Sequence, residues 1–198
     1  MRTIVLASTS KRRKEIFSLL GIPFVVSAPN YDEDNNLKMS PTNLVKRLSY
    51  EKANSLVDSF KSAIIIGSDT LVINKGAVLP KPKSEDEAVD MLMSLSDTTH
   101  SILTGYAIVD AISGKNSMGA RETQVTFRKI SRDEAKSYIK KEDVLDVAGA
   151  YDHEHLGSIF VINLNGDYFS SIGLPLYNIA LLLKNNYSID VLKYHVKK

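Results

Sequence analysis

Cysteine is absent from the 198-residue chain, and so are long apolar runs. Without cysteine the chain can form neither a disulfide nor a thiolate metal site, although this leaves the cellular compartment open. No run approaches the roughly 20 apolar residues that span a bilayer. We expect no secretory signal, because Arg2 precedes a short strand-like run that ends in polar residues. We therefore expect a cytoplasmic protein with no membrane partner.

An excess of charge of one sign is also missing. The 25 Lys and Arg residues nearly balance the 23 Asp and Glu residues, for a net charge of +2. We therefore expect no broad basic face and no stable nucleic-acid partner, so any anion site must be local. A composition that is 43% hydrophobic and 24% charged is typical of a globular protein. The length fits one ordinary domain, or at most two small ones, with a substantial core, and we predict a single domain over residues 1–198.

Two common phosphate-binding motifs, GxxxxGK[ST] and GxGxxG, are missing too. Their absence argues against a P-loop kinase and a Rossmann dehydrogenase. The fold must come from another arrangement of the strand and helix patterns, which are mixed along the whole chain. Asn165-Gly166 is typical of a type I′ hairpin turn whose second strand would contain Tyr168 and Phe169. We predict an α/β fold with a mixed sheet and flanking helices.

A cluster of cations stands at the start of the first predicted helix. The apolar run 4–7 leads through the hydroxyl residues Ser8 to Ser10 into cations at 11–14. The helix dipole disfavours each cation there by roughly 0.3–1 kcal/mol. A strand that leads through a hydroxyl-rich loop into a helix N-terminus is also a geometry that binds phosphate. We interpret the stretch as a phosphate site; the alternative is a solvated basic cluster or a localisation signal.

Two further charged residues fall where apolar ones are expected. Lys52 lies on the apolar side of a helix that is predicted to begin at Ser40 and Pro41 and to run to about residue 59, since about 100° of rotation per residue places it inside the apolar stripe. It must pair, extend its ammonium group to the surface, or reach a phosphate. Asp69 interrupts a strand that is otherwise apolar over 63–73. A structural carboxylate there caps a loop or pairs with a base, whereas a functional one binds metal or handles a proton.

Other polar clusters lie in predicted loops. Lys81 is held between two prolines, which stiffen the segment. The acidic loop 32–34 follows a short predicted strand. Residues 152–155 combine two histidines with two carboxylates, a composition that suits zinc. Glu154 would face away from both histidines on an extended strand, so a structural zinc site is the weaker interpretation.

Together these features resemble one family, the Maf (septum-formation inhibitor) nucleotide pyrophosphatases. The matching motifs follow the family's order from residue 4 to about residue 183. A single motif would be weak, but a complete ordered series is specific. The motifs are Leu6 to Arg13, Asp32-Glu33, Glu51 to Ala53, Ile66 to Thr70, Lys81-Pro82, His100 with Thr104-Gly105, Ala148 to Tyr151 and Gly173 to Leu176.

The resemblance implies an elongated α/β domain with a central cleft, similar to inosine triphosphatases and often a homodimer. It implies a nucleoside triphosphate diphosphatase, a house-cleaning hydrolase that yields the monophosphate and diphosphate with a water activated by Mg²⁺ or Mn²⁺. Glu33 and Asp69 would serve the metal and the water, with Asp69 as proton acceptor. The phosphate ligands that it implies are Ser8, Ser10, Arg12, Arg13, Lys52 and Lys81, the two lysines being catalytic.

The residues present suit this chemistry. Attack of water at the α-phosphorus develops negative charge that positioned cations stabilise, and oxygen ligands suit Mg²⁺. The rival interpretation is a non-catalytic regulator of cell division that binds nucleotide or nucleic acid. Intact Glu33 and Asp69 argue against it, since a pure anion binder gains nothing from nearby carboxylates.

The resemblance does not assign the base. Arg12 and Thr70 match the pattern of the dTTP/UTP-selective group, in which a glutamine occupies the third position. This chain has Glu154 there, as in the 7-methyl-GTP-selective group, whose first two positions differ. A glutamate accepts hydrogen bonds and does not donate them, so it favours a base edge that presents donors. The chain also has Asn30, Lys11 and Pro80 where an acidic residue, a proline and a glycine are common.

Overall fold

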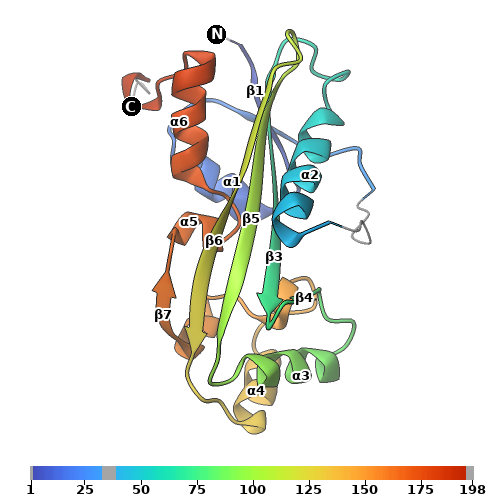
Figure 1. Cartoon of the computed structure of the whole chain (residues 1–198), viewed down its shortest axis with the longest axis vertical. Coiled ribbons are helices and arrows are strands. Elements are labelled where there is room, and N and C mark those ends of the chain that lie inside the picture. Colours follow the sequence, from blue (N-terminus) through green and yellow to red (C-terminus); the bar gives the residue numbers. More distant parts are fainter. Residues whose placement is uncertain (1, 33–38, 195–198) are drawn as a thin grey trace. The chain divides into compact units, whose positions relative to one another are not determined.

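The computed structural model describes residues 2–32 and 39–194, and the chain divides into two compact units (Figure 1). Unit 1 consists of Met1–Thr70, Thr104–Arg121 and Phe169–Lys198, and unit 2 of Leu71–Leu103 and Glu122–Tyr168. The expectation of a single domain over residues 1–198 stays a prediction. In the described residues no helix is both long enough and apolar enough to cross a membrane.

Seven strands form one mixed sheet in the order β2-β1-β3-β5-β6-β7, with β4 paired to β3. Strand β1 is parallel to β2 and β3, whereas the β3–β4 and β6–β7 pairs are antiparallel. This confirms the predicted α/β class with a mixed sheet. The strands are β1 (Ile4–Ala7), β2 (Val25–Ser27), β3 (Ile64–Asn74), β4 (Ala77–Leu79), β5 (Thr99–Asp110), β6 (Asn116–Phe127) and β7 (Val161–Asn165).

The described residues also form α-helices and short 3₁₀ helices. The α-helices are α1 (Lys11–Ser18), α2 (Pro41–Asn54), α3 (Glu85–Leu95), α4 (Arg132–Ile139), α5 (Tyr168–Ser171) and α6 (Leu176–Tyr187). Short 3₁₀ helices are η1 (Ala148–Ala150), η2 (Leu156–Phe160) and η3 (Val191–Lys193). Serine side chains cap the starts of α1, α2, α3 and α4, and the cap of α2 confirms the predicted start at Ser40.

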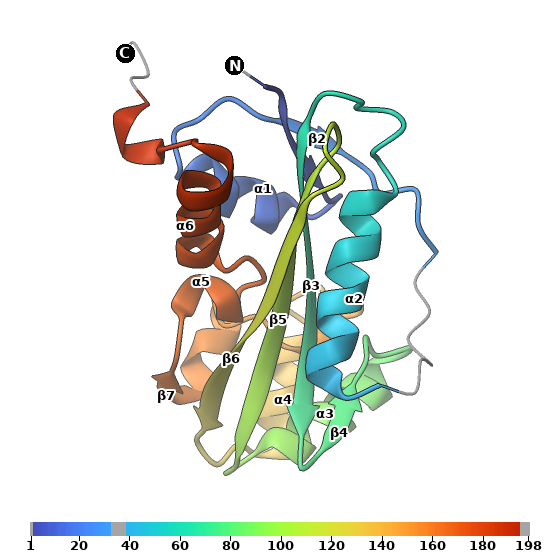
Figure 2. The same cartoon turned by 45° about the horizontal axis from the view of Figure 1, so that its top comes forward.

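Unit 1 has three layers, with α2 on one face of β1 and β3 and with α1 and α6 on the other (Figure 2). Both strands are apolar throughout these layers because each face is covered. Alternate residues pack in opposite directions. The face toward α1 and α6 holds Ile4, Leu6, Ile64 and Ile66, and the face toward α2 holds Val5, Ala7 and Ile65.

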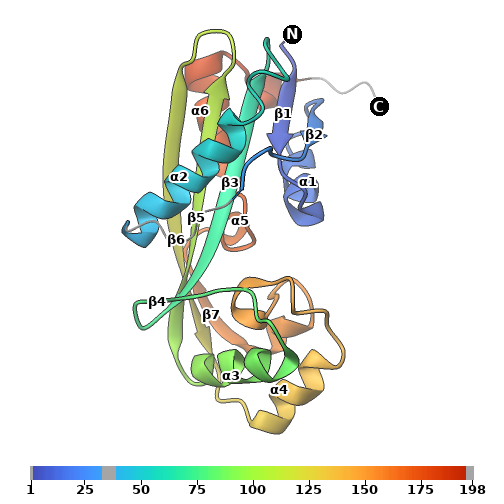
Figure 3. The same ribbon diagram turned by 90° about the vertical axis from the view of Figure 1, so that its right-hand side faces the viewer.

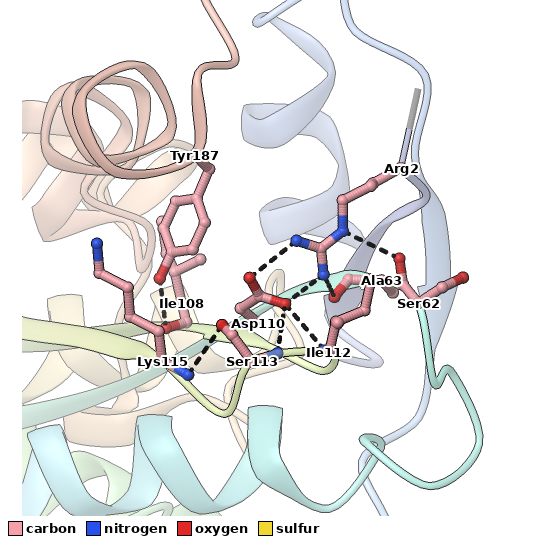
Figure 4. A network of polar contacts seen from close by, with 9 residues as sticks. All are labelled: Arg2, Ser62, Ala63, Ile108, Asp110, Ile112, Ser113, Lys115 and Tyr187. Atoms are coloured by element: carbon pink, nitrogen blue, oxygen red, sulfur yellow. Dashed lines mark hydrogen bonds and ion pairs between the residues drawn. The ribbon is translucent and has the colours of Figure 1, made fainter.

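A network of polar contacts lies in unit 1 at the start of β1 (Figure 4). The Arg2 guanidinium forms a two-pronged ion pair with Asp110 and also donates to the carbonyls of Ser62 and Ala63. Asp110 in turn accepts the backbone N–H of Ile112 at 2.9 Å. The Arg2 charge, followed by these backbone donors, holds the pKa of Asp110 well below its usual range. The network therefore ties the start of β1 to the end of β5.

Unit 2 has its own apolar core, against which α3 and α4 pack side by side (Figure 3). Phe127, Tyr138 and Phe160 are among its buried aromatic side chains. A capping box begins α4: Ser131 accepts the N–H of Glu134, whose carboxylate accepts the N–H of Ser131.

Two expected elements differ in the structure. Helix α2 ends at Asn54, rather than near residue 59, because the following N–H groups bond three residues back and form turns: Leu56 to Ala53 and Val57 to Asn54. The predicted hairpin at Asn165-Gly166 is wrong, since residues 168–171 form helix α5. A side chain at Gly166 would lie 2.7 Å from the Thr123 hydroxyl. Close approach to β6, rather than a type I′ turn, explains this glycine.

Candidate active site

The predicted site in unit 1 lies where β1 ends and β3 continues (Figure 3). These parallel strands are paired up to Ala7 and Gly67, and β3 then extends to Asn74. Residues 68–70 therefore lie beyond the carboxyl end of β1. In α/β sheets this edge is the usual place for a ligand, because the loops that follow the parallel strands gather there.

Two serines order the loop between β1 and α1. The Ser8 hydroxyl accepts the backbone N–H of Ser10 at 3.1 Å, and the Ser10 hydroxyl accepts that of Arg13 at 3.3 Å. Ser8 is buried. Each hydroxyl oxygen thus satisfies a backbone donor of the helix start, and its hydrogen can point toward an anion.

The cations of the first turn of α1 fall into two classes. Lys11 and Lys14 are exposed to solvent, which reduces the unfavourable interaction with the helix dipole. Arg12 and Arg13 are half-buried. Arg13 donates from Nε to the carbonyl of Gly173 at 2.9 Å and from Nη2 to Thr70 Oγ1 at 3.2 Å. Part of this guanidinium therefore fastens α1 to β3 and to the loop before α6.

Lys52 and Asp69 form a buried ion pair. Lys52 Nζ lies 2.5 Å from Asp69 Oδ1, and both residues are only 6% exposed. The interpretation that the ammonium of Lys52 extends to the surface is therefore wrong, and the predicted pairing is confirmed. Removing either partner would leave the other charge buried without this contact, which is strongly unfavourable.

Small residues allow this ion pair to form. A side chain at Gly67 would place its first carbon 2.1 Å from the Ser49 carbonyl oxygen, and at Gly105 2.2 Å from the Val45 carbonyl oxygen. Helix α2 therefore packs directly on the backbones of β3 and β5. This close packing brings the side chain of Lys52 within reach of β3.

Hydroxyl groups gather on the opposite face of β3. Ser68 Oγ lies 2.7 Å from the Gly105 carbonyl oxygen and 2.9 Å from that of Gly173. Thr70 Oγ1 lies 3.0 Å from Thr104 Oγ1, which donates to the Ser170 carbonyl at 2.8 Å. Sequence reasoning noted Thr104 only as part of a motif and did not mention Ser170. Their meeting with Thr70 depends on strand order, for which the sequence carries no local signal.

Successive residues of β3 consequently present different chemistry on the two faces. Asp69 points toward α2 and its lysine, whereas Thr70 points toward Arg13 and Thr104. The side chains of a strand alternate in this way. Unit 1 thus joins an ion pair, a helix start with two serines and a set of hydroxyl groups at one edge of the sheet.

Two predicted site residues lie in unit 2, and a third is not described. Glu33 is outside the described residues. Lys81, in unit 2, forms an ion pair with Asp146 at 2.5 Å, but their side chains are 60% and 88% exposed, so the pair adds little stability. Glu154, also in unit 2, is half-buried, and its backbone N–H donates to Asp152 Oδ1 at 2.9 Å.

The cluster at 152–155 orders a turn. His155 Nδ1 lies 3.0 Å from Asp152 Oδ2, and this carboxylate raises the pKa of His155. Within the described ranges, no group of three or more His, Cys, Asp and Glu residues is arranged to hold a metal ion.

Asp69 can nevertheless contribute to a magnesium site. Mg²⁺ in nucleotide-processing enzymes is usually bound by one or two carboxylates together with phosphate oxygens and water, rather than by a cage of protein ligands. A buried carboxylate beside a candidate phosphate site has that donor chemistry. Asp69 and the neighbouring candidate phosphate site therefore fit a Mg²⁺ or Mn²⁺ ion that is also bound by triphosphate oxygens.

Comparison with known proteins gives a consistent assignment. A family model described as "Maf-like protein" matches residues 3–186. The dTTP/UTP pyrophosphatase of Alkaliphilus oremlandii is 36% identical over 193 residues, which cover 97% of this chain and 100% of that protein. The dTTP/UTP pyrophosphatase of Bacillus cereus is 38% identical over 191 residues, 96% of this chain and 98% of that protein.

Two solved structures share a distant likeness. The Staphylococcus aureus Ham1 protein aligns with a TM-score of 0.46 and 12% identity, over 64% of this chain and 72% of that chain. A nucleoside-triphosphatase (dITP/XTP pyrophosphatase) from Mycobacterium abscessus aligns with a TM-score of 0.40 and 14% identity, over 65% and 75%.

Proposed function

The chain belongs to the Maf-like protein family, and from this premise we propose that it is a nucleoside triphosphate pyrophosphatase acting on dTTP and UTP. It hydrolyses them to the monophosphate and diphosphate. The observation that carries the proposal is the buried pair of Lys52 and Asp69 beside the start of α1. Relatives that are 36–38% identical over nearly the whole chain are named for this activity.

The reaction needs a water molecule, a proton acceptor and positive charge around the phosphates. Water attacks the α-phosphorus, and the bond between that phosphorus and the bridging oxygen breaks to release diphosphate. Asp69 accepts the proton of the attacking water, which is general base catalysis. Its hydrogen bond with Lys52 orients the carboxylate before substrate arrives.

Charge stabilisation comes from the start of α1 and from the lysines. Ser8, Ser10 and Arg12 face the triphosphate together with the N–H groups of the first helical turn. The resemblance of the sequence to the family adds Lys52 and Lys81 as further donors to phosphate oxygens. These donors lower the barrier because they stabilise the charge that develops on the phosphate oxygens.

A divalent ion completes this proposal. Mg²⁺ or Mn²⁺ held by Asp69, with Glu33 as the second ligand that the sequence predicts, would supply Lewis-acid stabilisation of phosphate oxygens. Asp69 supports the assignment through its donor chemistry and its place at the sheet edge.

The test is a measurement of diphosphate release from a nucleotide panel with Mg²⁺ or Mn²⁺. The panel includes dTTP, UTP, dCTP, dGTP and 7-methyl-GTP, because Glu154 departs from the usual dTTP/UTP pattern. We expect dTTP and UTP to be hydrolysed fastest. Preferential hydrolysis of 7-methyl-GTP would reassign the base, and no diphosphate from any nucleotide at micromolar enzyme would overturn the function. The homodimer and the cytoplasmic location stay predictions from the sequence.

A further inference from the structure

We propose that Thr104 and the main-chain carbonyl of Ser170 fix the direction of the Thr70 hydroxyl, so that Thr70 can only accept a hydrogen bond from the nucleotide base. This makes Thr104 a positioning residue for base selection. The inference rests on the proposed function, because it takes a pyrimidine nucleotide as the ligand. It concerns the choice between uracil or thymine and cytosine.

The direction follows from the order of the contacts. Thr104 Oγ1 lies 2.8 Å from the Ser170 carbonyl oxygen, which has no hydrogen to give, so Thr104 must donate to it. Thr104 has then used its single hydrogen. In its 3.0 Å contact with Thr70, Thr104 must therefore accept, and Thr70 must donate.

Arg13 completes the assignment from the other side. Its Nη2 lies 3.2 Å from Thr70 Oγ1 and can only donate. Among the described residues, these two contacts take the hydrogen and one of the two lone pairs of Thr70. The second lone pair is left for a ligand.

The opposite direction would bring two acceptors together. If Thr104 donated to Thr70, its oxygen and the Ser170 carbonyl oxygen would face each other at 2.8 Å with no hydrogen between them. Thr104 is fully buried, so water cannot relieve that contact. The Ser170 carbonyl, in α5, also accepts the N–H of Gly173 at 3.0 Å, which fixes its position.

Thr70 is the outer end of this hydroxyl relay, the series of hydrogen bonds from Thr70 through Thr104 to the Ser170 carbonyl. It is half-buried, lies beyond the last β1 pairing and is bonded to the residue that follows Arg12. A base held near the start of α1 would meet this hydroxyl. Uracil and thymine carry one ring N–H donor, at N3, whereas N3 of cytosine is an acceptor. If the Thr70 hydroxyl oxygen only accepts, it forms a hydrogen bond with N3–H of uracil or thymine. With cytosine it would meet N3, a second acceptor, and this contact disfavours cytosine.

The experiment compares binding of the α,β-imido analogues of dUTP and dCTP, which resist cleavage at the α-phosphorus. The variant Thr104→Val removes the hydroxyl with little change in volume and releases the Thr70 hydrogen for cytosine N3. Thr104→Ala removes the same hydroxyl and serves if the valine variant does not fold. Thr104→Ser retains it. Thr99→Val is the matched control, because it breaks another threonine pair, Thr99 with Thr126, at 2.9 Å in unit 2.

We expect the unaltered protein to bind the dUTP analogue roughly tenfold or more tightly than the dCTP analogue, about the effect of one buried hydrogen bond. Thr104→Val and Thr104→Ala should remove most of that ratio, mainly by improving binding of the dCTP analogue. Thr104→Ser and Thr99→Val should keep it. A ratio near one in the unaltered protein, or a ratio that the loss of the Thr104 hydroxyl leaves unchanged, would overturn the inference.

Hydrolysis assays distinguish this inference from the proposed function. If the ratio of the two binding affinities depends on the Thr104 hydroxyl but no diphosphate is released, the enzymatic function is overturned. The inferred direction of the hydroxyl groups is then still supported. If dTTP is hydrolysed rapidly and the dTTP to dCTP ratio of kcat/KM is the same with and without the Thr104 hydroxyl, only the inference is overturned.

Discussion

Two buried carboxylates in this protein each form an ion pair with an identified cation. Asp69 is paired with Lys52 inside unit 1, and Asp110 with Arg2 at the start of β1. The first pair has a catalytic role in our proposal, whereas the second ties strands together. Burial alone does not distinguish the catalytic role from the structural one. The position of Asp69 does, because this residue lies on β3 just beyond the carboxyl end of β1.

Replacing Asp69 tests its role as proton acceptor. We expect Asp69→Asn to lower kcat by roughly 10² to 10⁴, the usual contribution of a general base. The amide oxygen can still accept from Lys52, so the circular dichroism spectrum should stay that of the folded protein. Asp58→Asn, at an exposed position, is the control and should keep full activity. Retained activity in Asp69→Asn would remove the residue from the mechanism.

His100 makes stability depend on pH. It is 2% exposed and lies 2.6 Å from the Tyr151 hydroxyl, with Phe127 packed against its ring. Burial, reinforced by the nearby His153, lowers the pKa of His100 to about 4, while burial raises the pKa of Tyr151. The unfolded chain therefore binds a proton near pH 6.5 that the folded chain does not take up until about pH 4.

The free energy of unfolding should consequently be highest above pH 6.5 and fall by about 3 kcal/mol as the pH drops toward 4. Urea unfolding between pH 4 and 7 measures this slope. His100→Asn should flatten it, whereas His155→Gln should not, because Asp152 raises the pKa of this exposed histidine instead. An equal slope in His100→Asn and the unaltered protein would contradict the assignment.

At the scale of elements, helix starts and close packing decide where the side chains of the site point. Serine caps set the first turn of four helices, and glycines let α2 pack on β3 and β5. The caps are visible in the sequence, but the packing distance is not. Each feature can be changed separately.

The cap of α1 differs in purpose from the cap of α4. Ser10→Ala and Ser131→Ala should each lower the free energy of unfolding by about 1 kcal/mol, since each removes one cap. Only Ser10→Ala should weaken binding of a nucleotide analogue, because in our proposal α1 faces the triphosphate. Calorimetric titration and urea unfolding of both variants provide the comparison. Equal nucleotide affinity in the two variants would argue against a phosphate site at α1.

Close packing of α2 on β3 should be necessary for the ion pair. Gly67→Ala places a methyl group 2.1 Å from the Ser49 carbonyl, and the resulting overpacking should cost about 1–3 kcal/mol. Moving α2 away would also separate Lys52 from Asp69 and reduce kcat. Gly76→Ala is the control: it meets no atom within 4 Å but has a φ of 83°, so it should lower stability and leave activity intact. Full activity in Gly67→Ala would contradict this dependence.

For the whole molecule, the activity should depend on a divalent ion that the fold itself does not need. The three apolar clusters of the described residues consist of packed side chains. We expect EDTA to abolish diphosphate release, Mg²⁺ or Mn²⁺ to restore it, and the thermal unfolding midpoint without nucleotide to change little. Undiminished hydrolysis in EDTA would exclude the predicted role of Asp69 and Glu33 as metal ligands.

The sequence alone was sufficient for the family, the mixed α/β class, the helix starts and the inward direction of Lys52. These features depend on local periodicity and caps, or on motifs in order, all of which can be read from neighbouring residues. It misplaced the end of α2 and predicted a hairpin where α5 forms, because Gly166 is needed for close approach to another strand.

Only the tertiary structure decided which polar groups meet. The pairs Lys52–Asp69, Thr70–Thr104 and Arg13–Gly173 are separated by 17, 34 and 160 positions. Strand order and the close packing at Gly67 and Gly105 bring them together, and no local pattern encodes either. The sequence therefore singles out the candidate phosphate ligands one by one, whereas the hydroxyl relay that we propose selects the base could not be predicted from it.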